Sequence, residues 1–247
     1  MVSPILVDNN EAYASEFDPD QNSQDKAAIF ALWAMYARAK AVPTAVWDAE
    51  AEVMRYPNGR VVPEAVVRRN INLISARVGQ EIGETTRRLQ NGEVTVDYWH
   101  DDGAEKLRRL YWLSAVMAFG GVSRGVLQGE RSLVLPHMIF QLRLWRGLAN
   151  EIATSEAVLR SRAFARAVMY GRAGSVVYQN SRRAFYGRVL RYGQERRVLG
   201  IVEKHCPDCP SIAQQGWQPA GTLPAIGDSV CRSYCACRFE FRRGDNE

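Results

Sequence analysis

The sequence has 247 residues, of which 47% are hydrophobic and 24% are charged. These values exclude a wholly disordered chain, and the length suffices for one sizeable core with a small appended module. The formal net charge of +5 allows contact with nucleic acid or with an acidic protein surface but requires neither.

Charge is distributed unevenly along the chain. Residues 1–25 carry acidic side chains and no lysine or arginine, whereas residues 143–197 carry twelve arginines and only three glutamates. Such asymmetry is typical of an interaction protein. We expect residues 1–25 to form an acidic flexible arm, residues 26–197 a helical body, and residues 198–247 a cysteine-rich module.

The first predicted helix spans residues 25–40. It ends before Pro43, because proline disfavours helical geometry in the residue that precedes it. Thr44 is the predicted cap of a second, short helix that ends before the turn signal of residues 57–59 (Pro-Asn-Gly).

A longer helix is predicted from Pro63 to the Asn-Gly pair at residues 91–92. Apolar residues recur along it at steps of three and four, so that one stripe faces the core. The stripe consists of Val67, Ile71, Ile74, Val78 and Ile82.

Residues 93–99 alternate weakly between apolar and polar, which predicts a short strand. Asp101 or Asp102 then caps a helix that ends at the Gly-Gly pair of residues 120–121. The apolar stretch of residues 110–122 is shorter than the roughly 20 residues that span a bilayer. The N-terminus also lacks a basic start followed by an apolar run. We therefore expect a soluble protein with no membrane contact.

Two more helices follow in the prediction, one from Pro136 and one over residues 155–192. The second contains small residues that allow close packing, namely Ala163, Ala167, Gly171 and Gly174. Its arginines surround the helix, a pattern typical of helices that bridge domains or partners. The residues expected to contact nucleic acid or a partner protein are Arg162, Arg166, Arg172, Arg182, Arg183 and Arg188.

All the cysteines lie near the C-terminus, between predicted strands at residues 196–202 and 238–242. Cys206 and Cys209 form a C-x₂-C pair, and Cys231 and Cys235 form a C-x₃-C pair. Two such turns can supply the four thiolates of a structural zinc site, and thiolates select zinc or iron–sulfur over hard cations. These four are the predicted Zn²⁺ ligands, with Cys237 as the alternative fourth ligand. The fold class is therefore mainly α, with a long arginine-rich helix and a small C-terminal zinc-stabilised β module.

Three segments of the C-terminal region also carry a resemblance. The runs HCPDCPSIAQQGW, LPAIGD and CRSYCACRFEFR together resemble the C-terminal module of the phage Mu F-like head morphogenesis proteins, also called minor capsid proteins. The resemblance covers roughly residues 155–243. Many relatives carry His-Pro-Asn before a C-x-C, whereas this sequence has Cys231 and one extra residue of spacing, so the choice between Cys235 and Cys237 stays open.

The resemblance implies a structural and assembly protein of a tailed bacteriophage head, without enzymatic activity. It implies a location in the virion, at the portal or the inner capsid surface, and in the host cytoplasm during assembly. The implied partners are the portal protein, the major capsid protein and packaged DNA. The arginine-rich helix is compatible with phosphate contacts, which are independent of base sequence and weaken with salt.

Two other classes of function are weighed against this one. The first is a zinc-containing DNA-binding regulator, but residues 203–230 carry Glu203, Asp208 and Asp228 against Lys204 alone, so the tip is not basic. The second is a serine hydrolase, because residues 121–125 match the G-x-S-x-G motif around Ser123. That motif requires a strand before the serine and a helix after it, whereas here a helix precedes a glycine-rich loop.

Overall fold

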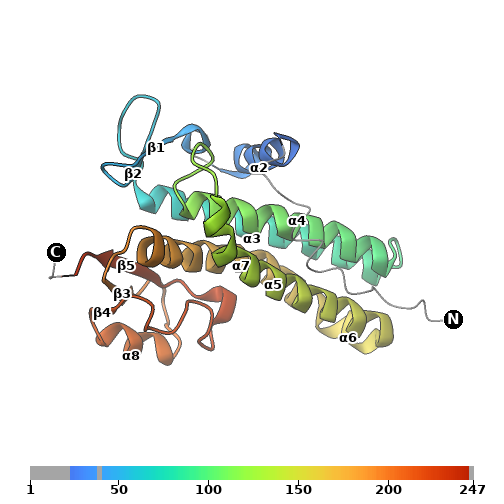
Figure 1. The fold of residues 1–247 in the computed structure, drawn as a ribbon. Helices are drawn as coiled ribbons and strands as arrows, with labels where there is room; N and C mark the ends of the chain where they lie inside the picture. The colour runs from blue at the N-terminus through green and yellow to red at the C-terminus, as the bar shows by residue number, and fades with distance from the viewer. Residues whose placement is uncertain (1–22, 38–40, 245–247) are drawn as a thin grey trace.

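The computed structural model describes residues 23–37 and 41–244. It is mainly helical, with a small sheet near the C-terminus, as the sequence predicts (Figure 1). The helices of the body are α2 (Ser23–Tyr36), α3 (Glu64–Gln90), α4 (Val96–Ala118), α5 (Gln128–Thr154), α6 (Glu156–Ser161) and α7 (Ala163–Ala184). Most of the predicted acidic arm, residues 1–22, lies outside the described residues.

Helix α7 occupies the centre of the body, where it contacts α3, α4 and α5. The predicted apolar stripe of α3, from Val67 to Ile82, is buried against these neighbours. Gly171 of α7 allows the closest approach, since a Cβ atom placed on it would lie 2.3 Å from the Cα atom of Gly79 in α3. Gly171, one of the small residues predicted to permit close packing, therefore does so at this helix crossing.

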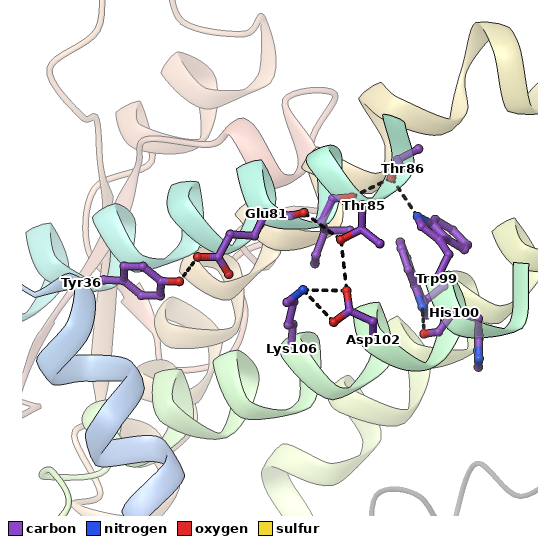
Figure 2. A network of polar contacts seen from close by, with 10 residues as sticks. Tyr36, Glu81, Thr85, Thr86, Trp99, His100, Asp102 and Lys106 are labelled. Atoms are coloured by element: carbon purple, nitrogen blue, oxygen red, sulfur yellow. Dashed lines mark hydrogen bonds and ion pairs between the residues drawn. The ribbon is translucent and has the colours of Figure 1, made fainter. Parts of the chain in front are cut away.

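A polar network also links the helices (Figure 2). The Tyr36 hydroxyl of α2 donates to Glu81 of α3, and Thr85 on the next turn donates to Asp102 of α4 at 3.2 Å. Asp102 also pairs with Lys106 at 2.6 Å. Further along, the indole of Trp99 donates to Thr86 at 2.8 Å. These bonds join side chains from α2, α3 and α4, so the network fixes the relative positions of the three helices.

The sequence predicted a second helix after Thr44, but residues 42–55 do not form one. A 3₁₀ turn, η1 (Val42–Thr44), leads into a hairpin of β1 (Val46–Asp48) and β2 (Val53–Arg55), in which Trp47 pairs with Met54. Asp48 closes the hairpin by accepting the backbone N–H of Ala51 at 3.0 Å. The prediction was wrong because each strand has only three residues, too few to show a period of two.

The strand predicted at residues 93–99 is also absent from the described chain. Thr95 caps α4 instead of Asp101 or Asp102, since its side chain accepts the backbone N–H of Tyr98 at 3.2 Å. A threonine oxygen that satisfies one of the free N–H groups of the first turn stabilises the helix start. As predicted, α4 ends before Gly120 and Gly121, which both have positive φ angles.

Helix α5 begins eight residues before the predicted start, at Gln128, so Pro136 lies inside the helix and not at its first turn. The start is stabilised by Glu130, whose carboxylate accepts the backbone N–H of Leu127 at 3.0 Å and pairs with Arg124 at 2.6 Å. A side chain that reaches back to the backbone in this way satisfies a free N–H group at the helix N-terminus.

The long helix predicted over residues 155–192 is divided. It breaks at Arg162, between α6 and α7, and it ends in a π-helical turn, η2 (Phe185–Val189). Ser155 caps α6 by accepting the backbone N–H of Val158. No helix among residues 23–37 and 41–244 has the length and apolar character needed to cross a bilayer.

The C-terminal module follows η2 and lies along the end of α7 (Figure 1). Its sheet places β3 (Gln194–Val198) between β4 (Gln218–Pro219) and β5 (Arg238–Arg242), with both pairings antiparallel. The module also contains the helix α8 (Asp208–Gln214) and the 3₁₀ turn η3 (Arg232–Tyr234). The strand predicted at residues 238–242 is confirmed, whereas the one predicted at 196–202 begins and ends earlier.

Candidate metal centre

The C-x₂-C turn brings the first two thiols together at the start of α8. The Sγ atoms of Cys206 and Cys209 lie 3.1 Å apart. The backbone N–H groups of Asp208 and Cys209 point to the sulfur of Cys206. Burial raises the pKa of this thiol, but hydrogen bonding with Cys209 and with these N–H groups outweighs burial, and its pKa lies below the ordinary value. The turn thus favours a thiolate, the form that binds metals.

The remaining cysteines approach from the other end of the module. Cys231 precedes η3 and Cys235 follows it, while Cys237 lies directly before β5. The Sγ atom of Cys231 is 3.5 Å from that of Cys206 and 3.9 Å from that of Cys209. The Sγ atom of Cys235 is also 3.9 Å from that of Cys209. Cys209 is therefore the sulfur around which the other four gather.

The spacing of these sulfurs suits a bound ion. In a tetrahedral site with Zn–S bonds of about 2.3 Å, neighbouring sulfurs lie roughly 3.8 Å apart. Cys206, Cys209 and Cys231 form one group whose sulfurs lie within 4.8 Å of one another, and Cys209, Cys235 and Cys237 form a second. The cluster can hold a metal ion, and both fourth ligands considered from the sequence lie in it.

Protonation differs across the cluster. Hydrogen bonding from Cys235, which outweighs burial, lowers the pKa of Cys237 to about 5. The same contact and burial raise the pKa of Cys235, and burial raises that of Cys209. Metal binding replaces these protons, because cysteine coordinates as the thiolate.

A buried ion pair supports the sheet beside the cluster. Glu195 of β3 is fully buried and accepts two hydrogen bonds from Arg183 of α7, at 2.5 and 2.8 Å. It also accepts the backbone N–H of Leu223 at 3.2 Å, and Arg183 donates to the carbonyl of the same residue. This ion pair connects the last turn of α7 to the loop between the two halves of the cysteine cluster.

The apolar core of the module is small. Its fully buried members are Ile212, Leu223, Ile226 and Phe239. Further contacts with α7 supplement it: Asn180 donates to the carbonyl of Ile226 at 3.0 Å, and the guanidinium of Arg172 lies 4.7 Å from the ring centre of Tyr234. A core of this size contributes little folding free energy, so the module depends on further interactions such as these contacts.

The six arginines predicted to contact nucleic acid or a partner fall into two groups. Arg182 and Arg183 point into the chain, where Arg182 donates to the carbonyl of Phe239 at 3.3 Å and lies 3.7 Å from Glu64. Arg166 pairs with Glu151. The exposed members of the set are Arg162, Arg172 and Arg188.

Ser123 lies in the turn after α4, between two positive-φ glycines at residues 121 and 125. Its hydroxyl donates to the carbonyl of Ala45 at 2.5 Å, which ties this turn to the residue before β1. The arrangement is a helix end and a turn, not the strand, serine and helix of a hydrolase elbow.

Sequence reasoning missed two charged residues of the module, Glu195 and Arg197. Both are buried, and both project from the inner face of β3. β3 has charged residues at three consecutive positions, 195–197, so its sequence shows no apolar alternation that would indicate which face is buried. The acidic residue and the arginine would have been assigned to the interior only with their partners known.

Comparison of the chain with protein-family models, with curated proteins and with solved structures gave no match.

Proposed function

We propose that this protein is a structural and assembly component of a tailed bacteriophage head, at the portal or inner capsid surface, with a C-terminal module that is stabilised by zinc. The observation that carries the proposal is the convergence of Cys206, Cys209 and Cys231, whose sulfurs lie 3.1–3.9 Å apart. This convergence occurs within the segments that resemble the Mu F-like module.

Zinc is the ion that fits the donors best. The ligands are sulfurs, which favour zinc or iron–sulfur over magnesium and calcium, and four of them complete a tetrahedral site. When all four positions are occupied by cysteine, no open position remains for a substrate. A structural role follows from that coordination, since the ion then holds together a tip whose apolar core is small.

The exposed arginines support a role in assembly. Arg162, Arg172 and Arg188 are exposed, whereas Arg182 and Arg183 hold the module against α7. The helix that carries the module therefore has both inward and outward basic residues. Outward arginines suit a contact with the portal protein, the capsid protein or packaged DNA.

The test is a binding experiment with the proteins encoded in the same genome. The purified chain is mixed with the portal protein and with the major capsid protein, and complexes are separated by sedimentation. Co-sedimentation with either protein supports the proposal. Binding to neither, or a genome that encodes no portal and capsid proteins, overturns it.

The same preparation distinguishes the DNA-binding regulator. Such a protein would retain a specific DNA duplex at moderate salt and would discriminate between sequences. Binding that is independent of sequence and falls steeply with salt supports phosphate contacts made during packaging.

A further inference from the structure

Arg197 is the buried charge that the contacts described so far leave without a counter-ion. The residue is 2% exposed and lies on β3 opposite Phe239 of β5. Its Nη2 atom donates to the carbonyl of Pro224, and its guanidinium carbon lies 4.7 Å from the ring centre of Phe239. Its Nε and Nη1 atoms, both buried, have no hydrogen-bond acceptor among the described residues.

The nearest carboxylate on the same face cannot balance this charge. Glu195 projects from β3 on the same side as Arg197, but both of its oxygens accept hydrogen bonds from Arg183. Three buried or half-buried groups therefore contribute two positive charges and one negative charge. A buried cation without an opposite charge is strongly unfavourable, so the surplus requires an anionic neighbour.

The cysteine cluster lies next to this surplus charge. Cys237 is two residues before Phe239 and, like Phe239, is buried. The loop after β3 closes over the same place, since a Cβ atom on Gly200 would lie 2.2 Å from the carbonyl oxygen of Ala236. Arg197, which pairs with Phe239, is therefore close to the Cys237 end of the cluster.

We propose that Arg197 compensates the charge of the loaded metal centre and thereby raises the affinity of the module for its ion. This inference rests on the proposed zinc site. A divalent ion bound by four thiolates is anionic overall, so a buried guanidinium beside it offsets the excess negative charge. In the metal-free chain the cluster carries less negative charge, so the same guanidinium is less fully compensated.

The two states give the proposal a distinctive prediction. Replacement of Arg197 by methionine removes the charge but keeps a long, unbranched apolar side chain. Arg197→Met is expected to weaken zinc binding by roughly tenfold to a hundredfold, the usual range for residues that support metal ligands. The metal-free protein is expected to lose much less stability than the zinc-bound protein, because the guanidinium offsets fewer negative charges when no ion is bound.

The matched control is Arg196→Met. Arg196 is the preceding residue of β3, is 43% exposed at its side chain, and pairs with Glu240 at 2.6 Å. The variant removes an equal charge from the outer face of the same strand, so its zinc affinity is expected to stay within a few-fold of the unaltered chain. A second variant, Arg197→Lys, keeps the charge and is expected to retain most of the affinity.

The experiment measures zinc affinity of the full chain by competition with a chromophoric chelator, and denaturant unfolding of each variant with and without zinc. Weaker zinc binding in Arg197→Met alone, with a much smaller loss of metal-free stability, supports the proposal. Equal losses with and without zinc mark a merely structural residue and overturn it, as does a loss in Arg197→Lys as large as in Arg197→Met. If the unaltered chain binds no zinc, the proposed metal site itself fails; if it binds zinc and Arg197→Met binds equally well, only the role of Arg197 fails.

Discussion

Gly79 and Gly171 face each other where α3 crosses α7, and neither position has room for a methyl group. A Cβ atom on Gly171 would lie 2.3 Å from the Cα atom and 2.4 Å from the backbone nitrogen of Gly79. Backbone atoms cannot move aside as the end of a flexible side chain can. The two helices can therefore approach this closely only because both positions are glycine.

Substitution of this glycine tests the crossing directly. Gly171→Ala is expected to destabilise the protein by about 1–3 kcal/mol, because the helices must separate to admit the methyl group. Gly147→Ala in α5 is the matched control, since nothing lies within 4 Å of its added Cβ atom. That variant should be neutral or more stable by up to about 1 kcal/mol, owing to the higher helix propensity of alanine. Denaturant unfolding of both proteins measures the difference, and equal stabilities would contradict the close contact.

The buried ion pair between α7 and β3 gives a second prediction. Glu195→Gln leaves Arg183 partly buried without a counter-ion, and the expected loss is about 3–5 kcal/mol of unfolding free energy. The control is Glu240→Gln, which breaks the more exposed pair with Arg196 and should cost less than about 1 kcal/mol. Thermal and denaturant unfolding report both values. Similar small losses in the two variants would show that the Arg183 pair contributes no more than a surface pair.

Removal of a metal ligand should lower both the zinc content and the stability of the protein. Cys206→Ser is expected to abolish stoichiometric zinc and to lower the free energy of unfolding by more than about 4 kcal/mol, as loss of a structural metal does. Ser211→Ala, on the exposed face of α8, is the control and should keep both. Elemental analysis and unfolding in excess chelator provide the measurements; full stability in chelator would argue against a structural ion.

Single substitutions can also identify the fourth ligand. Cys235→Ser and Cys237→Ser are prepared in parallel, and only the variant that lacks a true ligand should lose zinc affinity severely. The measurement is the same chelator competition. Equal, mild losses in both would indicate that either sulfur can complete the site.

The pH dependence of stability offers a test in the helical body. Burial raises the pKa of Glu81 above its ordinary value, so the folded chain prefers the protonated carboxyl. The folded state then binds more protons than the unfolded state between the two pKa values, and stability falls as pH rises through that window. Glu81→Gln cannot ionise, so it should be more stable than the unaltered chain at pH 7, by less than about 1 kcal/mol, and equally stable near pH 3. Glu50→Gln, at an exposed position of the hairpin turn, should show no such pH-dependent gain.

The regular part of the fold could be predicted from the sequence. The apolar residues of α3 recur over several turns, and glycines follow the ends of α3 and α4. The local sequence therefore indicates which face of α3 is buried and where both helices end. The cysteine spacing likewise identified the cluster, because two short turns place their sulfurs on the same side.

Elements that depend on distant partners could not be predicted. The strands around Trp47 and Met54 are defined by each other, and three residues carry no readable period. Glu130 stabilises the start of α5 and pairs with Arg124, a contact that could not be predicted from the sequence. Arg197 lies close to the cysteine cluster only because β3 pairs with β5, a contact between segments about forty residues apart.

The central position of α7 has a consequence for synthesis. A nascent chain that has emerged only through residue 160 possesses α3, α4 and α5, yet the helix that covers their shared apolar faces has not been made. The face of α3 that contains Gly79 is covered only after Gly171, some ninety residues later in the chain, has been synthesised. Such long-range closure slows folding and leaves apolar surface open to solvent in the meantime. The apolar faces that α3, α4 and α5 turn toward α7 accordingly stay uncovered until α7 has been synthesised.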